Sequence, residues 1–143
     1  MKRIFLSLSL LLTVSVTTTF ANPVSEKVLN SFKKEFAGAS AVQWNDLGEI
    51  LKASFVLGDR RVEAYFNVDG ELQGCIRNLF YNQLPLAVMT AVDKRFADAE
   101  ILDVNEITNP AGTSYTISLE FKNKKYQVKA DPGGNLAEIE KEK

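Results

Sequence analysis

Residues 28–37 read VLNSFKKEFA and residues 88–97 read VMTAVDKRFA, so the second stretch repeats the first after 60 positions. Between positions 28 and 45, six of 18 residues are identical to their counterparts 60 positions later, whereas about one identity is expected between unrelated sequences. In both stretches the apolar residues recur every three or four positions, which is the spacing of an amphipathic helix. The repeat therefore indicates that one structural unit, opened by a helix, occurs twice.

The repeat continues beyond the helices with a different offset. Gly70 aligns with Gly134 when the shift is 64 positions instead of 60. The four added residues fall within segment 106–112, whose asparagine, proline and glycine predict a longer turn. We therefore expect two units, residues 22–80 and residues 81–143.

After each helix the apolar period changes from 3.6 to 2, which indicates strands with one buried face. Tight turns at Gly58 and Gly70 separate these runs and favour antiparallel hairpins. The sequence thus predicts an α+β fold, a duplicated α-β-β-β-β unit with two helices packed on one face of antiparallel sheet. It leaves open whether the two sheets join. The expected strands are residues 41–45, 49–57, 60–68 and 71–78, then 100–107, 114–121, 124–130 and 135–140.

Strand alternation also predicts which side chains lie beneath the helices and which lie on the open side. Phe55 and Phe66 are expected beneath the first helix, together with Leu72 and Ile76. The opposite parity gives a mixed polar and aromatic set, the composition of many protein interfaces. The alternative is a solvated sheet face without a partner. The candidate partner-binding residues are Lys52, Arg61, Glu63, Tyr65 and Arg77.

The composition and motifs exclude or disfavour several classes of catalytic and binding site. The 143 residues include no histidine, which excludes Ser-His-Asp and Cys-His catalysis and histidine-ligated zinc. The formal net charge of −1 gives no electrostatic reason to expect nucleic acid as a partner. No phosphate-binding loop, Cys-x-x-Cys pair or converging carboxylate cluster occurs, so neither a cofactor nor a metal is expected.

Residues 1–21 resemble a secretory signal. Lys2 and Arg3 precede an apolar stretch, and small residues lead to a cleavage site expected after Ala21. Removing Lys2 and Arg3 leaves 15 basic and 18 acidic side chains, hence a net charge of −3. The alternative, a membrane anchor, is disfavoured because Ser7, Ser9 and Thr13 interrupt the stretch and it falls short of the roughly 20 apolar residues that a spanning helix needs. No second apolar run could span a bilayer. The mature chain is therefore expected to be periplasmic or secreted.

Two single residues have competing interpretations. Cys75 is the only cysteine, so it cannot form an internal disulfide, and a passive, partly buried thiol is favoured over a nucleophile or an intermolecular bridge. Trp44 is the only tryptophan. Its counterpart in the repeat is Val104, which favours a place in the core or at its edge over a partner anchor.

The export signal, the repeated helix pattern Val-Leu-x-x-Phe-x-x-x-Phe-x-x-Ala and the hairpin segment 65–72, YFNVDGEL, together resemble the exported PepSY-like group. That group is similar in fold to the β-lactamase inhibitor protein and is common in Bacteroidetes. The resemblance covers nearly all of the mature chain, and because the inhibitor binds its enzyme through a concave sheet surface, it allows a similar protein-binding surface here. It does not imply a β-lactamase as the target, and it assigns no contact residues.

Three classes of function are compatible with these observations. The first is a non-catalytic module that binds an unknown protein or peptide of the cell envelope through the open sheet face. The second is a structural or envelope-associated protein, or a binder of a small ligand. An enzyme ranks last, because nothing in the sequence places two carboxylates together in an apolar pocket.

Overall fold

The computed structural model describes residues 23–141, and it describes side chains as far as residue 136. The expected export signal, residues 1–21, lies outside the described residues. In chain order the elements are α1 (Glu26–Glu35), β1 (Ser40–Asp46), β2 (Ile50–Leu57), β3 (Arg60–Asn67), β4 (Leu72–Asn78), the 3-10 helix η1 (Tyr81–Gln83), α2 (Leu86–Arg95), β5 (Glu100–Asn109), β6 (Gly112–Phe121), β7 (Lys124–Ala130) and β8 (Leu136–Lys141).

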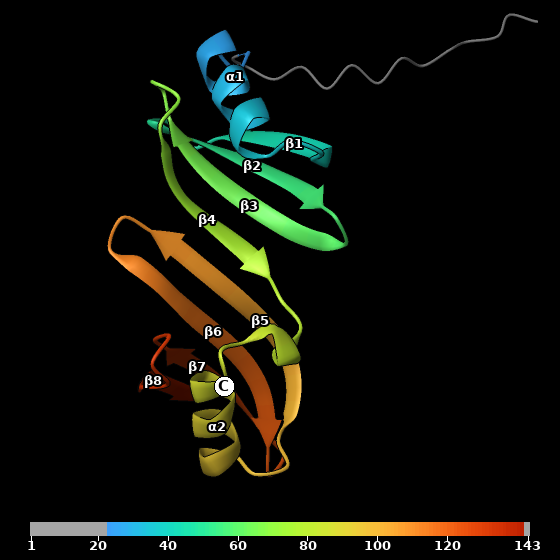
Figure 1. Cartoon of the computed structure of the whole chain (residues 1–143), viewed down its shortest axis with the longest axis vertical. Helices are drawn as coiled ribbons and strands as arrows, with labels where there is room; N and C mark the ends of the chain where they lie inside the picture. Colours follow the sequence, from blue (N-terminus) through green and yellow to red (C-terminus); the bar gives the residue numbers. More distant parts are fainter. Residues whose placement is uncertain (1–22, 142–143) are drawn as a thin grey trace, which may run out of the picture.

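The strands form one antiparallel sheet of eight strands, in which each strand pairs with its neighbours in the sequence (Figure 1). β4 and β5 join the two halves through four residue pairs, from Cys75 opposite Thr108 to Asn78 opposite Asn105. The sheet is therefore continuous from β1 to β8, which answers the question that the sequence leaves open.

Both helices lie on the same face of this sheet, here called the helix face, and the opposite face is the open face. Residues paired across neighbouring strands share a face, and the register links Ala64 to Cys75 and Cys75 to Thr108. Ala64 belongs to the core beneath α1. Val104, four residues before Thr108 on β5, belongs to the core beneath α2. The predicted packing of two helices on one face is confirmed.

Each helix covers its own hydrophobic core. On α1, the ring of Phe32 lies edge-on to Phe55, with 5.0 Å between the centroids, a geometry that adds to the energy of burial. Trp44 also meets Phe32 edge-on, at 5.3 Å, which confirms its predicted place at the edge of the core. The buried residues are Val28, Phe32, Ala53, Phe55, Val62, Ala64 and Phe66 in the first core, and Leu79, Leu84, Val88, Val92, Phe96, Val104, Tyr115, Ile117, Leu119, Val128 and Ala130 in the second.

A bulge in β4 changes the faces that alternation predicts. Strict alternation from Leu72 places Ile76 beneath α1 and Arg77 on the open face. Leu72 does pair with Phe66, but the register then shifts, because a bulge sets two residues of one strand opposite one of its neighbour. Arg77 consequently pairs with Val62 on the helix face, and Ile76 points to the open face. The predicted faces of Ile76 and Arg77 are wrong.

The connection between β5 and β6 is shorter than predicted. The sequence predicts a long turn within 106–112, but β5 continues to Asn109 and β6 begins at Gly112. The side-chain oxygen of Asn109 accepts a hydrogen bond from the Ala111 amide at 2.9 Å, and Gly112 adopts a φ of 129°. The four added residues therefore lengthen a hairpin instead of forming a loop.

Two turns press against the helices at matching positions. Gly70, between β3 and β4, and Gly134, between β7 and β8, have φ angles of 82° and 88°. A β-carbon added to Gly134 would lie 2.5 Å from the carbonyl oxygen of Ala87 on α2. One added to Gly70 would lie 3.1 Å from the carbonyl oxygen of Lys27 on α1. The missing side chain allows each turn to approach its helix.

Tyr81 connects η1 to α2. Its hydroxyl group donates to Asp93 Oδ1 at 2.8 Å and also lies 3.2 Å from the carbonyl oxygen of Met89. Burial and then the hydrogen bond to Asp93 raise the pKa of Tyr81 far above its ordinary value of 10.0. The folded protein thus holds this proton more tightly than the unfolded chain.

The raised pKa of Tyr81 predicts a dependence of stability on alkaline pH. The contribution is complete below the unfolded pKa and decreases as the pH rises from there towards the folded pKa, because the unfolded tyrosine then loses its proton first. The unchanged protein should lose unfolding free energy as the pH rises from about 9 to about 11, and we expect this loss to be smaller in Tyr81→Phe. Urea midpoints of both proteins across this range measure it. Equal slopes for the two proteins would contradict the prediction.

Candidate functional site

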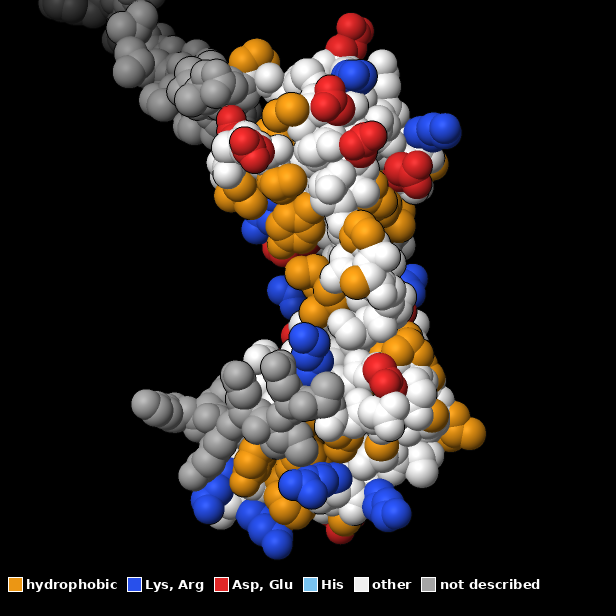
Figure 2. Space-filling view, turned by 90° about the vertical axis from the view of Figure 1, so that its left-hand side faces the viewer, with side chains coloured by type: hydrophobic (Ala, Val, Ile, Leu, Met, Phe, Trp, Pro, Cys, Tyr) orange, Lys and Arg blue, Asp and Glu red, His pale blue; other side chains and the backbone are white. Residues whose placement is uncertain are grey.

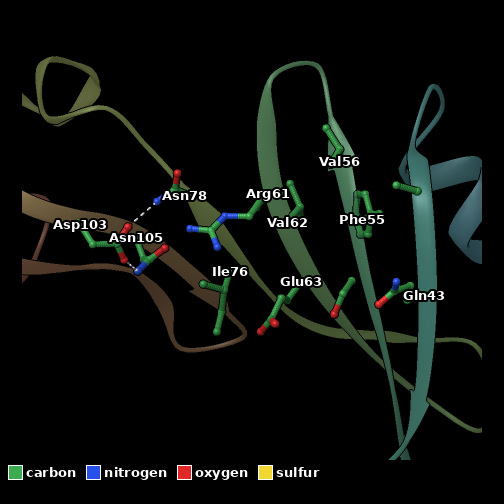
Figure 3. A pocket seen from close by; sticks show the side chains of 12 residues that line it. Gln43, Phe55, Val56, Arg61, Val62, Glu63, Ile76, Asn78, Asp103 and Asn105 are labelled. Carbon is green, nitrogen blue, oxygen red and sulfur yellow. Dashed lines mark hydrogen bonds between the residues drawn. The ribbon is translucent and has the colours of Figure 1, made fainter.

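The open face carries a hollow of about 510 Å³. It extends across β1 to β5, and therefore over the junction between the two halves (Figure 3). In the space-filling view the molecule is narrowest around mid-height, between a broader upper and a broader lower part (Figure 2). The residues that line the hollow are Ala41, Gln43, Ser54, Phe55, Val56, Arg61, Val62, Glu63, Ile76, Asn78, Asp103 and Asn105.

Four of the five candidate residues lie together on the open face. Lys52 is paired with Tyr65 and Ser54 with Glu63, so alternate residues of β2 and β3 point to this side. Lys52 Nζ lies 3.3 Å from Glu63 Oε1, and the Tyr65 hydroxyl group donates to Glu63 Oε2 at 3.0 Å. Burial, together with this hydrogen bond, raises the pKa of Tyr65. The Glu63 carboxylate is thus held from both sides.

Arg77, the fifth candidate, lies apart from this group. On the helix face its Nη2 atom donates to Glu106 Oε1 at 2.9 Å. Glu106, on β5, pairs with Arg77 of β4 on one side and with Tyr115 of β6 on the other. The Arg77–Glu106 ion pair therefore links the two halves and takes no part in the hollow.

Arg61 differs from the other cations around the centre of the sheet. Lys52, Arg60 and Arg77 each lie within 4 Å of a carboxylate. The guanidinium group of Arg61 is exposed, and within residues 23–136 it forms neither an ion pair nor a hydrogen bond. In Figure 3 it extends over the hollow towards Asn78 and Asn105. The hollow thus has an uncompensated positive charge on its wall.

Facing Arg61 is a polar cluster that the sequence analysis did not identify. Asp103 Oδ1 accepts from Asn78 Nδ2 at 2.8 Å, and Asp103 Oδ2 accepts from Asn105 Nδ2 at 2.6 Å. Asn78 also donates to the carbonyl oxygen of Val104 at 3.1 Å. The three side chains come from the end of β4 and from β5, which pair only through the junction of the two halves. No local sequence signal predicts this pairing.

Solved structures resemble this architecture closely. A BLIP-like protein from Bacteroides fragilis NCTC 9343 matches with a TM-score of 0.73 and 24% identity, over 84% of this chain and 87% of that one. A DUF2874 family protein from Bacteroides ovatus matches with a TM-score of 0.72 and 22% identity, over 84% and 89%. A proposed periplasmic protein from Bacteroides eggerthii matches with a TM-score of 0.74 and 21% identity, over 84% and 90%. The chain has a BLIP-like fold.

No family model matches the sequence, and no curated protein matches it. BLIP stands for β-lactamase inhibitor protein, so the structural matches confirm the fold that the sequence resemblance predicts. In the part of the chain that the structure describes, no helix is long and apolar enough to cross a membrane. The same part contains no group of three or more cysteine and acidic side chains arranged to hold a metal.

Two smaller hollows adjoin the centre of the BLIP-like fold. One, of about 300 Å³, is lined in part by Phe80 and Leu102, residues that are 56% and 45% exposed. The guanidinium carbon of Arg60 lies 3.1 Å from the centroid of the Phe80 ring. This cation–π contact connects Phe80, which follows β4, to β3 in the first half. The other hollow, of about 200 Å³, contains Cys75. Burial raises the pKa of this half-buried thiol, as expected of a passive cysteine.

Proposed function

We propose that this chain is an exported, non-catalytic binding module that holds a protein or peptide partner on the open face, around Arg61. The observation that supports this proposal is the hollow of about 510 Å³ on the open face. In it the exposed, unpaired guanidinium group of Arg61 faces the polar cluster around Asp103. Arginine is enriched at protein interfaces because it combines a large contact area with a directional charge. Glu63 lines the same hollow, and Lys52 and Tyr65 form the adjoining part of the proposed surface.

A binding surface accounts for the hollow better than a solvated sheet face. Alternating charges on a solvated face need only neutralise one another, as Lys52 and Glu63 do. The hollow also includes the half-buried apolar side chain of Ile76, and its polar cluster is fixed by three hydrogen bonds. Fixed polar groups beside apolar surface favour specific recognition, because they need not be ordered when a partner binds.

We also propose that the chain is exported from the cytoplasm and that it arose by duplication of one structural unit. Residues 1–21 are the export signal, and the eggerthii protein, which shares the fold and is a proposed periplasmic protein, supports a place outside the cytoplasm. The order of one helix and four strands occurs in both halves, and Gly70 and Gly134 contact the two helices alike. This supports two copies of one PepSY-like unit, residues 22–80 and 81–143.

A blocked hollow tests the proposed function. Ser54 lies in the hollow on β2 and belongs to neither core, so Ser54→Trp places a large side chain in the hollow. Gln127 lies on the open face of β7, outside the hollow and exposed, so Gln127→Trp is the matched control. We expect residues 22–143 to retain a stoichiometric partner from the cell-envelope extract of the host, and Ser54→Trp alone to lose it.

The proposal is contradicted if both tryptophan variants retain the same partners as the unchanged chain. Circular dichroism establishes that each variant is folded. Crosslinking followed by mass spectrometry then identifies the partner and shows whether residues of β2 and β3 lie at the contact.

A further inference from the structure

We infer that the hollow recognises an extended peptide segment with one acidic side chain whose neighbours carry no negative charge, and that Arg61 anchors this carboxylate. The inference rests on the proposed function and names the chemistry of the partner. Its basis is the distribution of charge and of satisfied hydrogen-bonding groups in the hollow, described next.

Arg61 is the cation available to a ligand. The neighbouring cations already have carboxylate partners: Glu63 for Lys52, Asp59 for Arg60 and Glu106 for Arg77. A guanidinium group presents paired N–H donors that match the two oxygens of a carboxylate. Because the group is exposed and unpaired within the described residues, a partner's carboxylate can bind it without breaking an existing contact.

The two carboxylates of the hollow limit the partner to a single acid. Glu63 is held by Lys52 and Tyr65, whereas Asp103 is held by two neutral amides and keeps an uncompensated negative charge. A partner residue next to the bound acid therefore meets acceptors: the Asp103 oxygens and the amide oxygens of Asn78 and Asn105. Backbone N–H groups and neutral donors fit there, while a second carboxylate is repelled.

The shape of the hollow favours a side chain over a chain end. The hollow is open across the sheet from β1 to β5, so a segment can enter at one rim and leave at the other. Val56 and Ile76 provide half-buried apolar surface beside Arg61 for the methylene groups of aspartate or glutamate. Burial of these methylene groups strengthens the ion pair between the peptide carboxylate and Arg61, because it excludes water from around the two charges.

Selection from a peptide library tests the inference. Residues 22–143 are incubated with random nine-residue peptides that are acetylated and amidated, so that carboxylates come from side chains alone. We expect the retained sequences to be enriched in one aspartate or glutamate and depleted in adjacent acids. We expect Arg61→Gln to lower the affinity of a selected peptide roughly 10- to 100-fold, the range for loss of a charged hydrogen-bonding partner. Arg61→Lys is expected to recover part of this loss.

The controls distinguish the inference from the proposed function. Peptides that are lost with Ser54→Trp but carry no acid, and that bind Arg61→Gln as well as the unchanged chain, would overturn the inference and leave the proposed function standing. Selected peptides that bind Ser54→Trp as well as Gln127→Trp would place binding outside the hollow and overturn both. Replacing the selected acid by its amide is expected to match the loss seen with Arg61→Gln.

Discussion

Phe66→Ala is expected to lower the free energy of unfolding by about 3–5 kcal/mol, which is the usual cost of removing a fully buried phenylalanine ring. Phe66 is 0% exposed, and its ring lies 6.3 Å from Phe32 and 6.1 Å from Trp44, measured between centroids. These residues belong to three different elements, α1, β1 and β3. The cavity would therefore weaken the packing of the helix on the sheet as well as remove apolar contact area. Urea denaturation followed by circular dichroism measures the change.

Val68→Ala is the control for Phe66→Ala. Val68 lies two residues further along the chain but is 58% exposed, so its truncation is expected to change the unfolding free energy by no more than about 0.5 kcal/mol. A similar loss in the two variants would show that the first core contributes little to stability, contrary to the packing described above.

Gly134→Ala is expected to destabilise the second half by about 2–5 kcal/mol. A positive φ costs a residue with a β-carbon about 1–2 kcal/mol, and Gly134 has a φ of 88°. The added β-carbon would also lie 2.5 Å from the Ala87 carbonyl oxygen, so the turn or α2 must shift. Forcing extra volume into a packed site costs about 1–3 kcal/mol. The thermal unfolding midpoint of the variant measures the combined effect.

Gly58→Ala separates the two causes. Gly58 also has a positive φ, of 64°, but a β-carbon there meets nothing within 4 Å. This variant is therefore expected to lose only the backbone contribution of about 1–2 kcal/mol. If Gly134→Ala is no more destabilising than Gly58→Ala, the close approach of the turn to α2 does not limit the packing of this half.

The sequence predicted the features that depend on local spacing. The helices, the strands and the tight turns follow from periodicity within one segment, and the antiparallel arrangement follows from short connections. Arg77 was misplaced because strict alternation takes no account of the bulge in β4, where the register shifts between Leu72 and Gly74. The cluster of Asn78, Asp103 and Asn105 depends on the pairing of β4 with β5, two strands whose residues lie about 25 positions apart in the chain.

The two separate cores beneath one continuous sheet have a consequence for the dynamics of the molecule. Four residue pairs between β4 and β5 and the Arg77–Glu106 ion pair connect halves that bury their apolar side chains independently. Proteins open locally in contiguous cooperative units, and we expect each half, with its own core, to form one such unit. Amide hydrogen exchange should therefore yield two opening free energies, one for each half, with the amides of β4 and β5 following the less stable half. Opening of that half would separate β4 from β5, and with them the two sides of the hollow, while the other half stays folded.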